Sequence, residues 1–294
     1  MDYDVVHAAI SDLRKKQIFF IGGVMKSGTT WLQLLLDAHP QVSCNGEAHF
    51  TRGLAPLLQH AFTQHSQLIA EKNKSIFNEL QGYPVLGDED IQYLLASSIS
   101  LYLLRQSKDK PTAHAVGEKS PKNVLYFDVF DALFPTAKFI HIVRDGRDCA
   151  VSGWFHNMRL SRDWTLKAHG SMDAYVLSFI DGWAKDVAGA QAIADANPAR
   201  VRQVRYEDLM ANVESVLADL FTFLNVDSGQ AVLAQCRSAA SFETLSGGRP
   251  AGQENLNSFF RKGEPGDWRN HMSKDLNAAI RNRAGAWLER FGYS

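Results

Sequence analysis

The chain has 294 residues, 45% of them hydrophobic, with 31 basic and 32 acidic side chains and a net charge of −1. This composition suffices for a full core in one or two domains, and the balanced charge gives no support for nucleic-acid binding. Three scattered cysteines are too few for a disulfide framework or a zinc site, and they favour a reducing, cytoplasmic location. Residues 1–16 contain Asp2, Asp4 and Asp12 and no apolar run of signal-peptide length, and they predict a short amphipathic helix. No uninterrupted apolar run reaches about 18 residues, so we expect no membrane span.

The first clear element along the chain is a short apolar strand at residues 18–21, followed by a glycine-rich turn. A helix is predicted to begin at Thr29 or Thr30. Residues 41–50 predict only a connection, and the polar residues 51–82 tolerate a helix.

The rest of the chain alternates between segments with the apolar pattern of a strand and segments with that of a helix. Further strands are predicted at 113–117, 137–143 and 201–205. Further helices are predicted at 88–106, about 123–133, from Asp145 onward, 172–196, 213–224 and 274–291. A glycine-rich loop is predicted at 247–266.

This alternation, with 20 or more residues between strands, predicts an α/β fold with a central parallel sheet flanked by helices on both faces. No linker-like stretch divides the chain, so we predict a single domain over residues 1–294. Anions bind such sheets at the carboxyl ends of the strands. Because the charged motifs of this chain follow its predicted strands, they predict one shared site.

The turn at residues 23–28 has the glycine spacing of a nucleotide-binding P-loop, but Thr29 stands where the lysine belongs and the lysine lies inside the turn, at Lys26. Such a turn at a helix N-terminus binds phosphate or another doubly charged oxyanion. Residues 26–31, KSGTTW, resemble the 5′-phosphosulfate loop of sulfotransferases that use 3′-phosphoadenosine 5′-phosphosulfate (PAPS). Taken alone, the loop leaves open an ordinary turn into a core helix, or a nucleotide kinase.

Two further motifs resemble the same family. Arg144, directly after a predicted strand, and Ser152, eight residues later, resemble its 3′-phosphate motif, although this pair alone also fits an Arg–Asp helix cap. Residues 261–268, RKGEPGDW, resemble its C-terminal R-K-G-x-x-G-D-W segment. With three motifs in the expected order, the chain is identified as a member of the PAPS-dependent sulfotransferases, which implies their P-loop NTPase-like fold.

The resemblance implies a role for each matched residue. The 5′-phosphosulfate binds at Lys26, Ser27, Gly28, Thr29 and Thr30. The 3′-phosphate binds at Arg144, Ser152, Arg261, Lys262 and Gly263. Adenine binds at Trp31, Tyr206 and Phe242, with a core position as the alternative for Trp31.

The general base is where the chain departs from part of the family. Cytosolic aryl and steroid sulfotransferases carry K-x-H, with the histidine as base, whereas this chain has Lys119 followed by serine and Pro121. The segment LDAHPQVSCNGE resembles the corresponding segment of tyrosylprotein sulfotransferases, which points to Glu47 as the base. His49 and His114 remain alternative bases.

Two lysines complete the catalytic prediction. We expect Lys26 to stabilise the leaving phosphate oxygen and Lys119 to act as a second cation near the sulfuryl group. The alternative for Lys119 is a salt bridge to Glu118 or another acid, and the alternative for Glu47 is a helix cap or a surface acid.

The sequence thus predicts sulfuryl transfer from PAPS to a hydroxyl or amine, most simply of a small molecule, without a metal. A nucleotide kinase needs G-K-[ST], which the loop lacks, and a non-catalytic binder of adenosine bisphosphate or of a sulfated ligand would not need Lys26, Glu47 and Lys119 together. The acceptor and the oligomeric state stay open.

The acceptor pocket is expected within segments 48–110, 154–172 and 247–260. Six aromatic side chains of these regions favour an apolar or aromatic acceptor: Phe50, Phe62, Phe77, Tyr83, Phe155 and Trp164. Four histidines are predicted to lie on the surface or in loops: His60, His65, His156 and His169.

Overall fold

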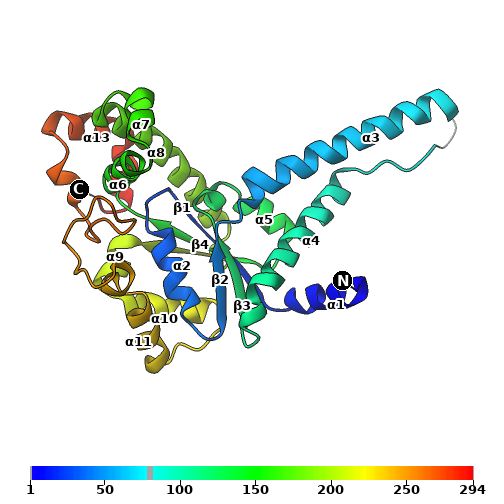
Figure 1. Ribbon diagram of the computed structural model, residues 1–294, viewed down its shortest axis with the longest axis horizontal. Helices are drawn as coiled ribbons and strands as arrows, with labels where there is room; N and C mark the ends of the chain where they lie inside the picture. The colour runs from blue at the N-terminus through cyan, green and yellow to red at the C-terminus, as the bar shows by residue number, and fades with distance from the viewer. Residues whose placement is uncertain (1, 78–81, 294) are drawn as a thin grey trace.

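The computed structural model describes residues 2–77 and 82–293 of the chain, and it contains a five-stranded parallel sheet with the strand order β2-β3-β1-β4-β5. The strands are β1 Gln17–Gly23, β2 Val42–Gly46, β3 Ala115–Lys119, β4 Lys138–Val143 and β5 Val201–Arg205. Figure 1 shows this sheet in the middle of the molecule with helices on both sides. The predicted α/β fold with a central parallel sheet is confirmed.

Helices occupy most of the remaining chain. They are α1 Tyr3–Leu13, α2 Thr29–Asp37, α3 Ala55–Phe77, α4 Asp88–Gln106, α5 Phe127–Leu133, α6 Gly146–Leu160, α7 Arg162–His169, α8 Met172–Ala196, α9 Tyr206–Ala211, α10 Val213–Phe223, α11 Gln230–Ala239, α12 Phe242–Ser246 and α13 Lys274–Arg290. Short 3-10 turns include Pro121–Leu125 and Asp267–Asn270.

The central strand β1 is buried on both faces, and its side chains alternate between two cores. Phe19 and Ile21 pack with leucines of α2 and α10, whereas Ile18 and Phe20 pack with apolar residues of α4 and α5. Successive side chains of a strand point to opposite faces, so one apolar run supplies both cores. A third cluster joins α6, α8 and α13. This packing fixes the end of β1, from which the glycine-rich turn leaves.

The predicted elements differ from the structure mainly at short segments. Residues 41–50 are not only a connection, because Val42–Gly46 pairs with β3 as the edge strand β2. The predicted helix at 123–133 is two elements, a 3-10 turn at Pro121–Leu125 followed by α5. Helices α7, α9, α11 and α12 had no counterpart in the prediction, and each has ten residues or fewer.

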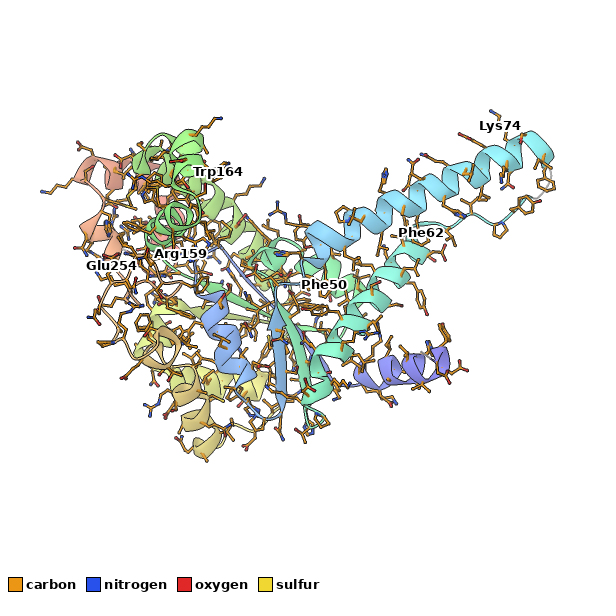
Figure 2. The ribbon with its side chains drawn as sticks, in the orientation of Figure 1. Phe50, Phe62, Lys74, Arg159, Trp164 and Glu254 are labelled. Carbon is orange, nitrogen blue, oxygen red and sulfur yellow. The ribbon has the colours of Figure 1, made fainter. Side chains whose placement is uncertain are left out.

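Helix α3 projects from the body of the molecule as an arm (Figure 1), and none of its residues is buried. The labelled side chains of Phe62 and Lys74 lie along it in Figure 2. In the described part of the chain, no helix has the length and apolar character needed to cross a membrane.

Candidate functional site

The carboxyl ends of the five strands lie at one edge of the sheet, and each continues into a predicted site residue or motif. The turn with Lys26 follows β1, and Glu47 follows β2. Lys119 ends β3, Arg144 follows β4 and Tyr206 follows β5. A cleft of about 270 Å³ lies at this edge, and most of the predicted site residues line it: Lys26, Gly28, Thr29, Thr30, Trp31, Glu47, Arg144, Ser152, Tyr206, Phe242, Arg261, Lys262 and Gly263. Residues of all three sequence motifs therefore line one cleft, together with Glu47 and Tyr206.

The turn after β1 presents the N-terminus of α2 to this cleft. Gly28 has φ of 100°, a conformation that favours glycine, and a Cβ built on it would lie 2.6 Å from the Tyr206 ring. Gly28 and Thr29 line the cleft at the first turn of α2, where backbone N–H groups lack partners within the helix. Ser27 does not line the cleft but is fully buried, and its hydroxyl has no hydrogen-bond partner among the described residues.

Lys26 lies among other cations. Its ammonium group is 4.6 Å from the centre of the Phe259 ring. Burial, and then the charges of Arg159 and Arg144, lower the pKa of Lys26 to about 8. A half-buried lysine close to other cations is stabilised by a bound anion, so this end of the cleft favours a negatively charged ligand.

Three further cations, Arg144, Arg261 and Lys262, line the same cleft. The Arg144 guanidinium stacks 4.2 Å from the centre of the Tyr206 ring and donates to the Lys26 carbonyl oxygen at 3.3 Å. Arg261 and Lys262 both contact the Asp267 carboxylate, at 2.5 and 2.7 Å. In the described part of the chain, Nε of Arg144 and Nε of Arg261 are buried without a hydrogen-bond partner. These donors are available to anionic oxygens.

The loop with Arg261 is attached to α6 through a buried carboxylate. Asp148 accepts the Gly266 N–H at 2.6 Å and the Trp268 N–H at 3.0 Å. It also lies 3.8 Å from Arg144, which follows β4 and precedes α6. Asp148 therefore places the RKGEPGDW segment beside Arg144, which explains how two motifs 117 residues apart in the sequence meet.

Aromatic rings line the same cleft. The Trp31 indole N–H donates to the Ala240 carbonyl oxygen at 2.8 Å, and its ring meets Tyr206 edge-to-face at 5.7 Å. Trp31 also packs against the core cluster of α2 and α10, so it has both the cleft position and the core position that the sequence left open. Phe242 lies so close to Gly263 that a Cβ there would be 2.4 Å from its ring.

Glu47 and Lys119 form an ion pair beside the first turn of α2. The Lys119 side chain is almost fully buried, and its ammonium lies 2.6 Å from Glu47 Oε1 and 3.2 Å from the Thr30 hydroxyl. About a third of the Glu47 side chain, 34%, stays exposed. The salt bridge of Lys119 is thus with Glu47 and not with Glu118. The partly exposed Glu47 carboxylate also lines the cleft, where it can meet a bound ligand.

The two alternative bases differ in position. His49 Nε2 lies 3.8 Å from Glu47 Oε2, at the same edge of the sheet. His114 precedes β3, where its carbonyl oxygen accepts the N–H of Gln17 at the start of β1. The sheet is parallel, so His114 lies at the opposite edge from the cleft, and the geometry does not support it as a base.

Comparison with known proteins identifies the family of the chain. The model of the Sulfotransferase family matches residues 18–229. The chain belongs to the sulfotransferase family. It is 28% identical over 223 residues to the protein-tyrosine sulfotransferase of Drosophila melanogaster, and 29% identical over 224 residues to protein-tyrosine sulfotransferase A of Caenorhabditis elegans. Each alignment covers 75% of this chain, but only 40% of the fly protein and 53% of the worm protein.

Solved structures give the same fold. The chain resembles mouse sulfotransferase SULT7A1 complexed with PAP, with a TM-score of 0.56 and 19% identity over 98% of this chain and 90% of the mouse chain. It resembles sulfotransferase STF9 from Mycobacterium avium with the same TM-score and 12% identity, over 98% and 82% of the two chains. At these identities the likeness shows a shared fold, and the predicted sulfotransferase fold is confirmed.

The sequence analysis missed several residues that line the cleft of this sulfotransferase. His156, predicted to lie on the surface or in a loop, lines it together with Asn157, and Phe259 and Phe260 line it from the glycine-rich loop. Burial, and then the charges of Lys26 and Arg159, lower the pKa of His156 to about 4. His156 lies four residues, about one helical turn, after Ser152. This spacing puts both side chains on the same face of the helix and could have predicted that His156 lines the site.

None of the six aromatic residues predicted for the acceptor pocket of this sulfotransferase lines the cleft. Phe50 is buried against Tyr102, Phe155 stacks on Arg261, and Phe62 lies on the α3 arm (Figure 2). Segments 154–172 and 247–260 do reach the cleft, but through the four side chains named above.

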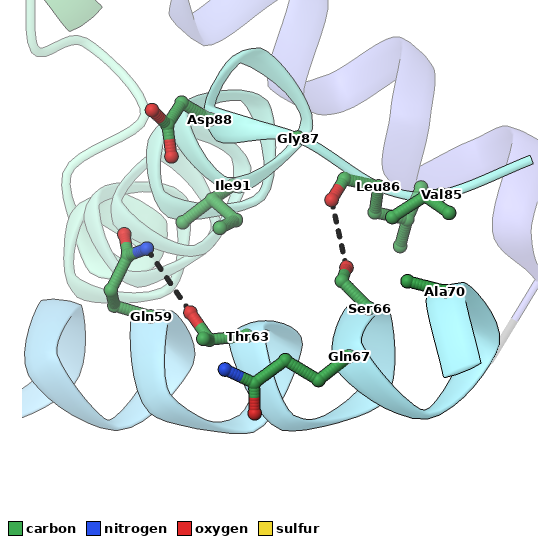
Figure 3. A pocket seen from close by; sticks show the side chains of 10 residues that line it. All are labelled: Gln59, Thr63, Ser66, Gln67, Ala70, Val85, Leu86, Gly87, Asp88 and Ile91. Atoms are coloured by element: carbon green, nitrogen blue, oxygen red, sulfur yellow. Dashed lines mark hydrogen bonds between the residues drawn. The ribbon is translucent and has the colours of Figure 1, made fainter. Parts of the chain in front are cut away.

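A second pocket lies along the α3 arm (Figure 3), between that helix and the residues that lead into α4. The Ser66 hydroxyl donates to the Leu86 carbonyl oxygen at 2.8 Å across it. Its lining residues include no lysine, arginine or histidine. It therefore lacks the chemistry of an anion site, and the cleft at the strand ends is the candidate active site.

Proposed function

We propose that this chain, as one domain over residues 1–294, transfers a sulfuryl group from PAPS to a hydroxyl or amine and releases adenosine 3′,5′-bisphosphate (PAP). The observation that carries the proposal is that two cationic groups and several aromatic rings line one cleft. One group is Lys26 at the α2 N-terminus, and the other is Arg144, Arg261 and Lys262. A nucleotide with anionic groups at its 5′ and 3′ positions has the complementary arrangement of charge.

The unpaired polar atoms support the fit to PAPS. Among the described residues, the buried Nε atoms of Arg144 and Arg261, two residues that line the cleft, have no hydrogen-bond partner. Buried donors cost free energy unless they are paired. Phosphate and sulfate oxygens are acceptors that satisfy them, so the residues present fit this group.

In the proposed mechanism, PAPS supplies an activated sulfuryl group on its 5′-phosphate. Lys26 and the free N–H groups of α2 stabilise the negative charge that develops on the leaving phosphate oxygen. Arg144, Ser152, Arg261, Lys262 and Gly263 hold the 3′-phosphate, and Trp31, Tyr206 and Phe242 contact the adenine. With the donor fixed at both ends, most of the rate acceleration comes from positioning and from charge stabilisation.

The acceptor is activated on the other side of the cleft. Glu47 takes the proton of the acceptor hydroxyl, and Lys119 holds the Glu47 carboxylate and adds positive charge near the sulfuryl group. We propose a small molecule as the acceptor. Because the curated relatives named above are protein-tyrosine sulfotransferases, a tyrosine peptide also belongs in any acceptor screen. A cytoplasmic location stays a prediction from the sequence.

Two measurements test the function. PAP should raise the melting temperature of the purified chain, and ATP with Mg²⁺ should raise it much less. Labelled PAPS should then give a labelled product with at least one of four acceptors: a phenol, a long-chain alcohol, a sugar and a tyrosine peptide. A melting shift with ATP and Mg²⁺ but none with PAP would favour a kinase, and PAP binding without any transfer would favour a non-catalytic binder.

A further inference from the structure

A buried carboxyl group lies directly behind the candidate base. Glu118 of β3 has no solvent exposure. Its Oε1 accepts the Ala48 N–H at 2.9 Å and the Ser120 hydroxyl at 2.7 Å, and its Oε2 accepts the Asn123 side-chain amide at 2.8 Å. Burying a carboxyl group is costly unless it is well hydrogen-bonded, and three donors meet that requirement here.

Glu118 and its neighbour Lys119 contact two consecutive residues of the segment after β2. Adjacent residues of a strand point to opposite faces, so the two side chains leave β3 on different sides. Lys119 reaches the Glu47 carboxylate at 2.6 Å, and Glu118 accepts the N–H of Ala48, the next residue. The dipeptide of β3 thus fixes both the side chain of the candidate base and the backbone that carries it.

We propose that Glu118 is a positioning residue, which holds the backbone at Ala48 so that the Glu47 carboxylate stays on Lys119 and faces the cleft. This inference rests on the proposed function, in which Glu47 is the base. Glu118 is not itself the base, because it has no exposure and its oxygens are occupied by three donors. Its effect reaches the acceptor only through Glu47.

Position matters at this point because a displacement of about 1 Å in a reacting group can lower the rate about 100-fold. The Glu47 side chain is partly exposed, and the residues on either side of it, Gly46 and Ala48, are small. Without its acceptor, the Ala48 N–H turns toward another partner or toward water, and the Glu47 carboxylate moves with the backbone.

The test compares Glu118→Ala, Glu118→Gln and Ser120→Ala in the full chain. Glu118→Ala removes the acceptor of the Ala48 N–H, and kcat should fall about 30- to 100-fold. The Kd of PAP should change less than threefold, because Glu118 touches none of the cationic groups. Glu118→Gln keeps an oxygen for Ala48 and should recover most of kcat. Ser120→Ala removes a different donor from the same carboxylate and should leave kcat within threefold.

Amide hydrogen exchange of a peptide that contains Ala48 gives a second readout. Exchange at Ala48 should be faster in Glu118→Ala and unchanged in Ser120→Ala. If Glu118→Ala does not fold, Glu118→Asp takes its place, because it keeps the carboxylate but withdraws it by one methylene from the Ala48 N–H. That variant should lower kcat at least tenfold.

The outcomes separate this inference from the proposed function. The kcat is measured with labelled PAPS and with the acceptor that gives the highest turnover of the four. A wild-type chain that turns over while Glu118→Ala, or Glu118→Asp in its place, keeps full kcat overturns the positioning role alone. A fall in kcat with an equal loss of PAP affinity also overturns it, since that pattern indicates general unfolding. A wild-type chain that neither binds PAP nor transfers sulfate overturns the proposed function.

Discussion

The pKa of Lys26 makes PAP binding depend on pH in a range where phosphate groups, with a second pKa of about 6, are already ionised. Burial, and then Arg159 and Arg144, lower the pKa of Lys26 to about 8. A phosphate binds the protonated lysine more tightly, so affinity is greatest below pH 8 and falls as the pH rises through 8. Between pH 7 and pH 9 the protonated fraction of Lys26 falls from about 0.9 to about 0.1, which raises the Kd of PAP about tenfold, or about 1.4 kcal/mol.

The assay is calorimetric titration of PAP at pH 7 and pH 9, at one fixed ionic strength, because salt screens charge interactions. Lys26→Arg is the matched control, since a guanidinium stays protonated at both pH values and its Kd should change less than twofold. His156, whose pKa is lowered to about 4, is neutral at both. Equal wild-type Kd values at pH 7 and pH 9, or the same tenfold change in Lys26→Arg, would refute the assignment of this titration to Lys26.

Three further substitutions test other parts of the site. Glu47→Gln should lower turnover of labelled PAPS at least about 100-fold with the Kd of PAP unchanged, and full activity would exclude Glu47 as the base. Gly28→Ala, with φ of 100° and the Tyr206 ring 2.6 Å from the new Cβ, should weaken PAP binding and lower the free energy of unfolding by about 1–3 kcal/mol. Its control is Gly189→Ala on α8, where a Cβ meets nothing within 4 Å and urea unfolding should show a gain of about 0.5–1 kcal/mol. Asp148→Asn leaves one of the two loop N–H groups without an acceptor and should lower the free energy of unfolding by about 1–3 kcal/mol. An unchanged melting temperature would contradict the role of Asp148 in holding that loop.

The sequence predicted four of the five strands, and two of these four have strong apolar runs. Residues 18–21 and 137–143 contain mostly large apolar side chains, and they correspond to β1 and β4 in the middle of the sheet. Strand β2 escaped prediction because its sequence, VSCNG, has one β-branched residue and ends in residues typical of turns. Its strand conformation comes from pairing with β3, about 70 residues away in the sequence, and the local sequence of β2 does not predict that contact.

The same limit applies to the site. Short motifs identify the residues that contact an anion, because the anion-binding groups of such a motif are neighbours in the sequence. The turn with Lys26 and the RKG segment are two examples. Motifs do not identify the residues that hold those groups in place. Asp148 and Glu118 act through backbone amides that lie 118 and 70 residues away, so their roles become visible only in the fold.

The site draws on all five strand ends, so it forms only when the whole sheet has formed. A ligand that binds there has no comparable site on the unfolded chain and therefore stabilises the entire domain rather than one loop. At a concentration 100 times its Kd, PAP would add about 2.7 kcal/mol to the free energy of unfolding. The protein with bound nucleotide should accordingly resist proteolysis throughout its core, including at strands that never touch the ligand.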